Sequence, residues 1–449
     1  MRATVTPADV APGSEIHARG SCAKGRGPAR LTLFLDHLRG GGLQKVWVTL
    51  GSAFVCRGYE VDMAVCEPDG PLRDELHERV RLVALPRSPG WRATAMAASS
   101  ARAVGASVAY PFLAHRLSAT FPFLPGLVSH LRTRRPDAVL AASPYMNIDA
   151  SLACRLAGVP SRLSVSEHIH LTPEHALSRG WSRWLLPGLL RATYDDASSV
   201  VAVSDGVAAD MVRRTGMPGA RIRTIYNPVV PPDLDARAGA QLDHPWFAPG
   251  APPVVLGAGR LGAAKDFPTL IRATAMARRH RQLRLVIIGA GSSPDKTAKR
   301  QAELMQLAHE LGIADAVHLP GFVPNPFAYM ARAAVFVLAS IHEGFGNVVA
   351  EALACGCPVV STDCPSGPAE ILDDGRFGAL VPVRDPNMMA QAILRTIESP
   401  PDRAVLKARA DMFTVARSVD QWAALLESCG VSGRAGASEP GDVSARARC

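Results

Sequence analysis

The sequence predicts an α/β protein made of two doubly wound, Rossmann-like domains that face a central cleft. Two series of short apolar segments alternate with helical patterns, one in each half of the chain, and such alternation is typical of parallel sheets covered by helices. A proline-rich stretch without apolar periodicity separates the two series. The 449 residues, 48% hydrophobic and 20% charged, are enough for two domains that each bury a core.

The first domain is predicted at residues 29–228. Residues 1–28 are rich in Gly, Pro and small polar residues, and we expect a disordered extension there. The expected strands of the first domain are 31–35, 60–65, 81–85, 137–141, 161–165 and 199–203.

A linker at 229–253 leads to the second domain, predicted at 254–414. Its expected strands are 253–258, 283–289, 317–319, 334–338, 358–361 and 378–381. A final helix is expected over 415–430, with apolar residues at helical spacing, and 431–449 again has the composition of a disordered tail.

Residues 343–351 read Glu-Gly-Phe-Gly-Asn-Val-Val-Ala-Glu and place two carboxylates eight positions apart. The two glycines after the first glutamate predict a loop up to about Asn347, which can cap a short helix. Glu343 then precedes a helix N-terminus, and Glu351 lies inside the helix. Because such an end offers free N–H groups and a positive dipole, a diphosphate can bind there while the carboxylates accept hydrogen bonds from sugar hydroxyls.

This segment resembles the Glu-x7-Glu signature of retaining, nucleotide-sugar-dependent glycosyltransferases of the large fourth family (glycosyl transferases group 1). Residues 354–372 resemble the strand and Gly-Pro-x-Glu-Ile turn that follow this signature. The resemblance implies the GT-B architecture, in which the last helix crosses back to the first domain. It also implies that Glu343 orients the transferred sugar and that Glu351 binds the ribose. The donor-binding positions between the two glutamates are Gly344, Phe345, Gly346, Asn347 and Val348.

The pattern Gly257-Ala-Gly-Arg-Leu-Gly262 follows an expected strand and matches G-x-G-x-x-G, so an NAD-binding domain has to be considered. It fits poorly, because Asp266 and Pro268 start the next helix late and no acidic residue ends the next strand. Arg260 and Lys265 suit two phosphates instead, the first as a planar fork and the second as a point charge. The segment resembles the family's diphosphate-binding segment, which implies that these cations neutralise the leaving nucleoside diphosphate.

Two segments of the first domain are expected to face the same cleft. Gly41 and Gly42 lie in a turn before a helix, where glycines let a ligand approach the backbone, and the family places a Gly-Gly loop here facing the donor phosphates. His168 ends an expected strand and matches the family's histidine that contacts the transferred sugar. Residues 203–207 and 225–229 resemble two further family segments that shape the cleft.

The net charge of +9 is unevenly distributed. Residues 29–228 hold 23 basic and 16 acidic side chains, giving +7, whereas 229–430 hold 19 and 20, giving −1. No recognised motif accompanies the charge, which disfavours nucleic acid. Anionic lipid headgroups are a possible partner, because residues 110–135 place aromatic and aliphatic side chains beside a basic cluster. A core helix with an exposed basic end is the alternative, and three prolines interrupt any long amphipathic helix there.

No segment of the chain approaches the ~20 apolar residues that a spanning helix requires. We therefore expect a cytoplasmic protein, with at most peripheral contact at the inner face of the membrane. The Asp-x-Asp pair at Asp233 and Asp235 lies in the linker, and the nine cysteines show no C-x-x-C spacing, so no metal ion and no resident cofactor are expected.

Together these features predict a retaining hexosyltransferase that moves a hexose or N-acetylhexosamine from a nucleoside-diphosphate sugar to a hydroxyl of a lipid-linked saccharide or polysaccharide. UDP is the family's commonest nucleotide. Arg260, Lys265 and the helix at Asn347 are expected to stabilise the leaving charge, with His168 beside the sugar. Two classes remain open: a sugar-nucleotide epimerase or hydrolase of similar form, and a catalytically silent sugar-nucleotide-binding protein.

Overall fold

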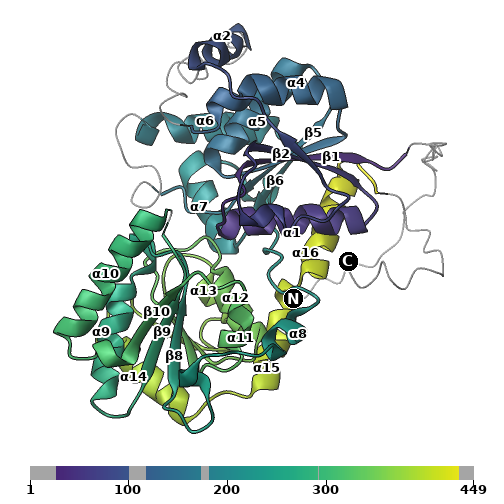
Figure 1. Cartoon of the computed structure of the whole chain (residues 1–449). Helices are drawn as coiled ribbons and strands as arrows, with labels where there is room; N and C mark the ends of the chain where they lie inside the picture. Colours follow the sequence, from purple (N-terminus) through teal and green to yellow (C-terminus); the bar gives the residue numbers. More distant parts are fainter. Residues whose placement is uncertain (1–26, 101–117, 173–181, 292, 434–449) are drawn as a thin grey trace, which may run out of the picture.

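The chain forms two lobes, each built on one parallel sheet with helices packed against it (Figure 1). The computed structural model describes residues 27–100, 118–172, 182–291 and 293–433. Residues 1–26 and 434–449, which belong to the two expected disordered extensions, lie outside these ranges. The predicted fold class, α/β with two doubly wound Rossmann-like domains, is confirmed.

The first sheet has the strand order β3-β2-β1-β4-β5-β6-β7. Its strands are β1 (Arg30–His37), β2 (Glu60–Glu67), β3 (Arg81–Ala84), β4 (Ala138–Ala142), β5 (Arg162–Glu167), β6 (Ser199–Ala202) and β7 (Ile222–Thr224). Its helices are α1 (Gly42–Cys56), α2 (Gly90–Ser100), α4 (Leu124–Arg134), α5 (Pro144–Ala157), α6 (Ser182–Asp196) and α7 (Asp205–Thr215). The order reverses between β1 and β4, and ligands of such sheets bind where it reverses, at the carboxyl ends of the strands.

The second sheet has the order β10-β9-β8-β11-β12-β13 and also reverses, between β8 and β11. Its strands are β8 (Val254–Ala258), β9 (Arg284–Ile288), β10 (Val317–Gly321), β11 (Val335–Leu338), β12 (Val359–Thr362) and β13 (Ala379–Val381). The helices after the linker helix α8 (Leu234–Gly239) are α9 (Phe267–Arg278), α10 (Pro294–Glu310), α11 (Pro326–Met330), α12 (Asn347–Ala354), α13 (Pro368–Ile371), α14 (Pro386–Glu398) and α15 (Arg403–Ala410).

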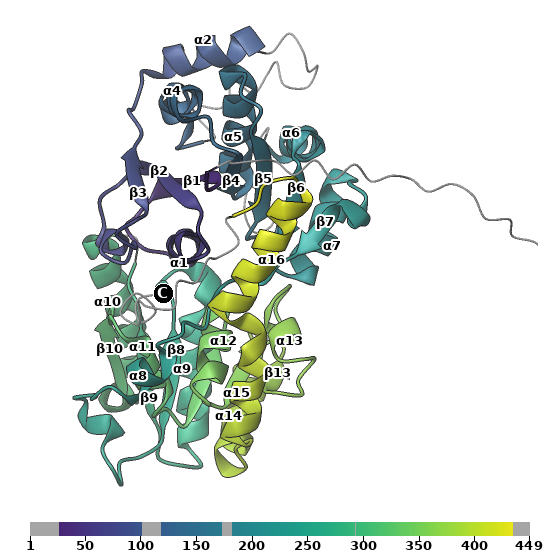
Figure 2. The ribbon, with the colours of Figure 1, turned by 90° about the vertical axis from the view of Figure 1, so that its right-hand side faces the viewer.

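The last helix, α16 (Val415–Ser428), runs from the second lobe back along the first (Figure 2). It packs against α1, where the rings of Trp47 and Trp422 meet edge to face with centroids 6.3 Å apart. The chain passes between the lobes twice, and the two passages are hydrogen-bonded to each other. The N–H groups of Val229 and Val230 both donate to the carbonyl of Phe413 at 3.0 Å. The lobes are therefore connected by a paired hinge instead of a single loose linker.

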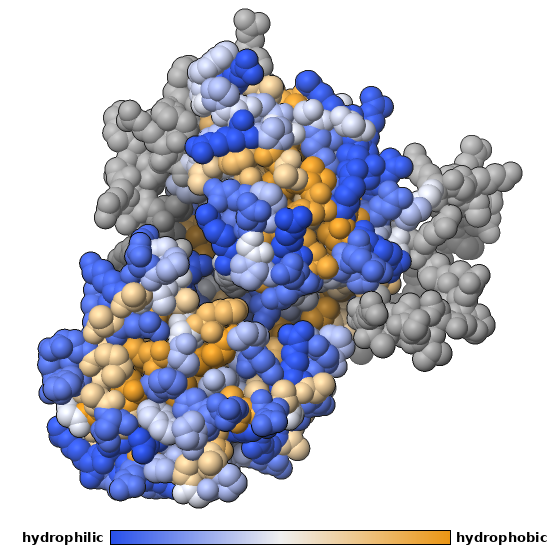
Figure 3. All heavy atoms as spheres, viewed as in Figure 1, coloured by the Kyte–Doolittle hydropathy of each residue, from blue (hydrophilic) through white to orange (hydrophobic). Residues whose placement is uncertain are grey.

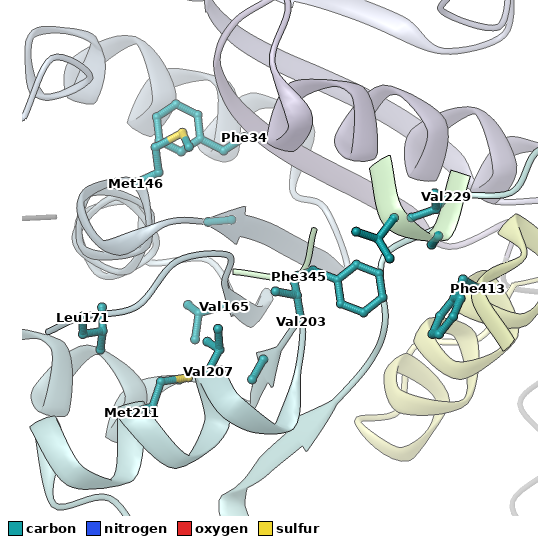
Figure 4. Close-up of a cluster of buried hydrophobic side chains, with 14 of the residues drawn as sticks. Phe34, Met146, Val165, Leu171, Val203, Val207, Met211, Val229, Phe345 and Phe413 are labelled. Carbon is teal, nitrogen blue, oxygen red and sulfur yellow. The ribbon is translucent and has the colours of Figure 1, made fainter. Parts of the chain in front are cut away.

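An apolar cluster also runs through both lobes. Phe345, from the loop before α12, lies between Val203 of the first lobe and Phe413 near the hinge (Figure 4). Its ring stacks on Tyr226 with centroids 5.4 Å apart. Because a buried aromatic ring contributes a large apolar area, this side chain fixes the loop before α12 against the first lobe.

The described aromatic and large aliphatic side chains of the expected membrane-facing segment are buried. Residues 110–117 of this segment lie outside the described residues. In the remainder, Phe121, Phe123 and Leu127 are at most 7% exposed and pack in the core of the first lobe. The prediction that these side chains face a bilayer is wrong, because they cover the sheet instead. Arg134 of the basic cluster donates to the buried carboxylate of Asp62 at 3.0 Å.

Within the described ranges, no helix combines the length and the apolar character needed to cross a bilayer. On the face seen in Figure 3, hydrophilic residues surround separate hydrophobic patches on the two lobes.

Candidate functional site

Loops at the carboxyl ends of strands from both sheets meet between the lobes. The loop after β11 contacts the end of β5: a Cβ atom at Gly344 would lie 1.9 Å from the carbonyl oxygen of His168. The hydroxyl of Ser204 donates to the carbonyl of Gly344 at 2.8 Å and accepts from the N–H of Val207, which caps α7. One side chain thus caps a helix of the first lobe and joins it to the second.

Glu343 forms the centre of a small polar cluster. Its Oε1 accepts from Nζ of Lys265 at 2.5 Å and from Oγ of Ser340 at 2.6 Å. The loop is further held by the Ser366 hydroxyl, which donates to the carbonyl of Glu343 at 2.8 Å. The structure therefore brings together two predicted site residues that are far apart in the sequence, and it fixes the Glu343 carboxylate in one orientation.

The glycines after β8 make room for Lys265. Gly259 has a φ of 147°, and a Cβ there would lie 3.0 Å from Cε of Lys265. Gly289 approaches the same turn so closely that its Cβ would lie 1.9 Å from the carbonyl oxygen of Gly259. The middle glycine of the G-x-G-x-x-G pattern is thus explained by the packing of the Lys265 stem, whereas a Cβ at Gly262 would meet no atom within 4 Å.

Arg260 lies beside the glycine turn of the first lobe. A Cβ at Gly41 would lie 3.0 Å from Nη2 of Arg260, and a Cβ at Gly42 would lie 3.7 Å from Nδ2 of Asn347. Gly41 has a φ of 142°, a conformation that favours glycine. The Arg260 side chain is exposed and has no hydrogen bond or ion pair among the described residues. An unpaired guanidinium, a glycine turn and a helix N-terminus therefore face one another.

The helix α12 begins one residue earlier than the sequence suggests. Gly346, with a φ of 91°, is the N-cap, and no side chain caps this end. Asn347 is the first helical residue, and its Oδ1 accepts from Nδ2 of Asn227 at 2.9 Å instead. The expectation that Asn347 caps the helix is wrong, because its side chain binds the first lobe. The first N–H groups of α12 consequently have no side-chain cap, and Val348 follows in the first turn.

Glu351 lies in the middle of α12 and is 8% exposed. Burial raises the pKa of its carboxyl, and the charges of Lys45 and Lys265 oppose this shift. The two lysines come from different lobes. The carboxyl therefore sits where the positive charges of both lobes converge.

His168 follows β5 and is neutral at pH 7, because burial lowers its pKa to about 3. Its Nε2 lies 3.1 Å from Oγ of Ser166, and its ring meets the edge of Trp47 with centroids 5.4 Å apart. The neighbouring His170 has a different environment, since its Nδ1 lies 3.6 Å from the buried carboxylate of Asp210. His170 therefore serves to hold its own loop.

A carboxylate of the second lobe makes a further contact with the first lobe. Both oxygens of Glu370 accept from the N–H of Asp205, at 2.9 and 3.0 Å, at the N-terminus of α7. A helix N-terminus attracts a negative charge, so this contact holds the two lobes together.

The Asp-x-Asp pair of the linker lies elsewhere. Asp233 accepts from Arg237 at 2.7 Å, and Asp235 accepts from Lys407 at 3.0 Å. In the described part of the chain, no group of three or more His, Cys, Asp or Glu side chains is arranged to hold a metal ion.

Known proteins resemble this chain in sequence and in fold. The family described as "Glycosyl transferases group 1" matches residues 252–399, and "Glycosyltransferase Family 4" matches residues 40–231. A relative from Campylobacter jejuni, N-acetylgalactosamine-N,N'-diacetylbacillosaminyl-diphospho-undecaprenol 4-alpha-N-acetylgalactosaminyltransferase, is 33% identical over 261 residues, which cover 58% of this chain and 67% of the relative. The chain belongs to the group 1 glycosyltransferases of family 4.

Three further known proteins resemble this glycosyltransferase, one over part of its sequence and two in fold. D-inositol 3-phosphate glycosyltransferase 2 of Catenulispora acidiphila is 35% identical over 214 residues, 46% of this chain and 49% of the relative. The structure of Anabaena HepE in complex with UDP superposes with a TM-score of 0.68 at 19% identity, covering 89% of this chain and all of that one. Sucrose-phosphate synthase of Thermosynechococcus elongatus superposes with a TM-score of 0.67 at 21% identity, covering 90% and 99%. The GT-B architecture of this glycosyltransferase is thereby shown.

The sequence does not predict several side chains of this glycosyltransferase's cleft. Lys45 follows the glycine turn by one helical turn, but a single lysine in a helix carries no signal of its own. Glu370 belongs to the Gly-Pro-x-Glu-Ile turn, whose resemblance to the family does not reveal its contact with α7. Ser204 and Asn227 lie in the two segments expected to shape the cleft, and both hydrogen-bond the loop or helix that carries the Glu-x7-Glu signature.

Proposed function

We propose that this glycosyltransferase moves a hexose or N-acetylhexosamine from a UDP-linked donor to a hydroxyl acceptor with retention of the anomeric configuration. The observation that carries the proposal is the meeting of Lys265, Glu343, Arg260 and the uncapped end of α12 at one point between the lobes. Cations and free N–H groups suit a diphosphate, and an oriented carboxylate suits sugar hydroxyls.

Each cation has its own part in the proposed reaction. Arg260, which has no partner among the described residues, is free to bind the diphosphate as a fork. Lys265 already binds Glu343, so it links the phosphate site to the carboxylate that orients the sugar. As the bond between sugar and diphosphate breaks, charge grows on the leaving oxygen, and fixed donors at that point stabilise the transition state. These groups supply that charge without a metal ion, so activity is expected to persist without divalent cations.

His168 is proposed to support the sugar near the reacting carbon. A neutral imidazole offers one donor and one acceptor, and it adds no positive charge that would compete for the diphosphate. Glu351 is proposed to bind the ribose diol, because a buried carboxyl among apolar helix residues needs a hydrogen-bonded partner. Gly344, Phe345, Gly346, Asn347 and Val348 would provide the donor-facing backbone between the two glutamates.

The choice of donor and acceptor class rests on similar proteins. Anabaena HepE is known in complex with UDP and with UDP-glucose. The name of the Campylobacter relative describes transfer of N-acetylgalactosamine, in alpha linkage, to a saccharide linked to diphospho-undecaprenol. The first supports a UDP-sugar donor, and the second supports a lipid-linked or polysaccharide glycan as the acceptor.

A lipid-linked acceptor would bring the enzyme to the cytoplasmic face of a membrane. We propose a peripheral contact through surface cations of the basic first domain, since the aromatic side chains described in its expected membrane segment are buried. Arg132 and Arg135 are exposed and belong to the basic end of that segment.

Product analysis tests the proposal. The purified chain is incubated with UDP-glucose, UDP-galactose and their two N-acetylhexosamine counterparts, together with a panel of saccharide and diphospho-lipid acceptors. Acceptor-dependent release of UDP in the presence of EDTA, with an alpha-linked product by NMR, is the expected result. Free sugar, an epimerised donor or binding without turnover would each contradict the proposed transfer.

A further inference from the structure

Lys45 reaches from the first lobe to the second. It lies in the first turns of α1, and its Nζ is 5.7 Å from the centroid of the Phe327 ring in α11. It follows Gly41 and Gly42 by one helical turn, so the three positions lie on neighbouring parts of one helix end. Gly41 faces Arg260 and Gly42 faces Asn347. This end of α1 therefore meets the second lobe at Arg260 and Asn347, which belong to the proposed donor site, and at Phe327.

The ammonium group of Lys45 is partly buried and has no hydrogen bond or ion pair among the described residues. The ammonium group lies over the ring of Phe327, and such a contact is a weak substitute for an anion. Glu351 is close enough to feel the charge, yet no ion pair joins the two side chains. Because withdrawing a cation from water costs free energy unless it is paired, this position is suited to an anion that a ligand brings.

The neighbours of Lys45 identify that anion. Arg260 and the N-terminal end of α12, where the proposed function places the diphosphate, lie beside Gly41 and Gly42, one helical turn before Lys45. The charge of Lys45 also acts on Glu351, which the same proposal assigns to the ribose. Of the two phosphates of a nucleoside diphosphate, the one attached to the nucleoside is nearer to the ribose, so it is the phosphate that a cation close to both sites would meet.

We propose that Lys45 binds the nucleoside-linked phosphate of the donor and thereby makes donor binding depend on both lobes. The inference rests on the proposed function, since it needs a nucleoside-diphosphate donor in this cleft. Arg260 and Lys265 hold the diphosphate from the second lobe only, whereas Lys45 adds a charge-assisted contact from the first lobe. A bound nucleotide would then stabilise the arrangement in which the lobes are closed.

The test compares Lys45→Gln and Lys45→Arg with the wild type by calorimetric titration with UDP, UMP and uridine. A hydrogen bond to a charged phosphate predicts that Lys45→Gln weakens both UDP and UMP binding about tenfold and leaves uridine binding unchanged. Lys45→Arg keeps the charge and should retain most of the affinity. Arg39→Gln is the matched control, because Arg39 lies just before the glycine turn, is exposed and pairs with Glu67 at 2.8 Å.

Three outcomes would overturn the assignment while leaving the proposed function intact. The first is that Lys45→Gln leaves UDP affinity unchanged. The second is an equal loss of affinity for uridine, which would mean that Lys45 acts through the ribose site. The third is a loss of affinity for UDP but not for UMP, which would place Lys45 at the outer phosphate. Failure of the wild type to bind UDP would instead overturn the proposed donor, and the assignment of Lys45 with it. Thermal unfolding of each variant checks that the fold is unchanged.

Discussion

Gly344 of the second lobe lies against the backbone of His168 in the first lobe, so closely that a Cβ atom at position 344 would be 1.9 Å from the carbonyl oxygen of His168. Glycine is required here by the close approach of two chains, since the φ angle of Gly344 is not in the left-handed region. The residue before it, Glu343, is held by Lys265 and Ser340. The spacing between the lobes and the orientation of the carboxylate are therefore set by the same short loop.

Gly344→Ala is expected to move this loop away from His168 and to reduce transfer far more than stability. Overpacking of this kind costs about 1–3 kcal/mol of stability, whereas displacement of Glu343 removes an oriented contact to the sugar. Thermal unfolding and steady-state kinetics measure the two effects. Gly188→Ala is the control, because no atom lies within 4 Å of a Cβ at that position of α6. Normal activity in Gly344→Ala would contradict the functional role of the contact.

Arg260→Ala should raise the donor KM and lower kcat, because the guanidinium is expected to meet the diphosphate in both the bound donor and the transition state. The expected loss of transition-state stabilisation is about 2–4 kcal/mol. Arg279→Ala removes another exposed arginine of the same lobe, at the end of α9, and should leave both constants unchanged. Wild-type kinetics in Arg260→Ala with every UDP-sugar that turns over would refute the assignment.

The two glutamates of the signature should respond differently to neutralisation. Glu351→Gln is expected to weaken UDP binding about tenfold, since a carboxylate accepts stronger hydrogen bonds from the ribose than an amide does. Glu343→Gln frees Lys265 from its partner, so UDP affinity should be kept or improved while transfer slows about 100-fold. Calorimetric titration of both variants with UDP, alongside kcat, distinguishes the roles. The reverse pattern would exchange them.

Much of the fold could be predicted because buried parallel strands read as continuous apolar runs. All the apolar segments expected to be strands are strands, and in the described part of the chain β7 is the one strand that the sequence does not predict. Its Ile222-Arg-Thr224 sequence is short and polar, because it lies at the edge of its sheet, where burial imposes no apolar pattern.

The site was harder to predict, because its contacts join residues that are distant in the sequence. The Glu-x7-Glu spacing points to Glu343 and Glu351, but it does not reveal that Lys265 binds the first of them. The pairing of Asn227 with Asn347 likewise depends on how the lobes are placed, and it takes away the capping role that local sequence rules assign to an asparagine. Such contacts follow from tertiary packing, which local propensity does not encode.

Membrane contact, if it is electrostatic, should depend on salt and on two exposed arginines. The chain is expected to sediment with vesicles containing anionic lipids at low ionic strength and to be released at high ionic strength. The double variant Arg132→Gln, Arg135→Asn should bind less, since asparagine tolerates the left-handed backbone of Arg135, with a φ of 46°. Arg134 is left in place because it pairs with buried Asp62. Absence of binding by the wild type at low salt would remove the proposal.

Glu167, at the end of β5, should make stability depend on pH. Burial raises the pKa of its carboxyl from 4.5 to about 8, although Tyr194 and Asn147 donate to Oε1 at 2.6 and 2.8 Å. Between these values the folded chain holds a proton that the unfolded chain releases, so stability falls as pH rises through this window and the full penalty is present above about pH 8.

Glu167→Gln removes this penalty. Denaturant unfolding at pH 6 and pH 9 should show the variant losing less stability than the wild type, by on the order of 2 kcal/mol. The control Glu398→Gln alters an exposed carboxylate and should lose as much stability as the wild type. If Glu167→Gln and the wild type lose equal stability between pH 6 and pH 9, Glu167 is already ionised in the folded state at pH 6.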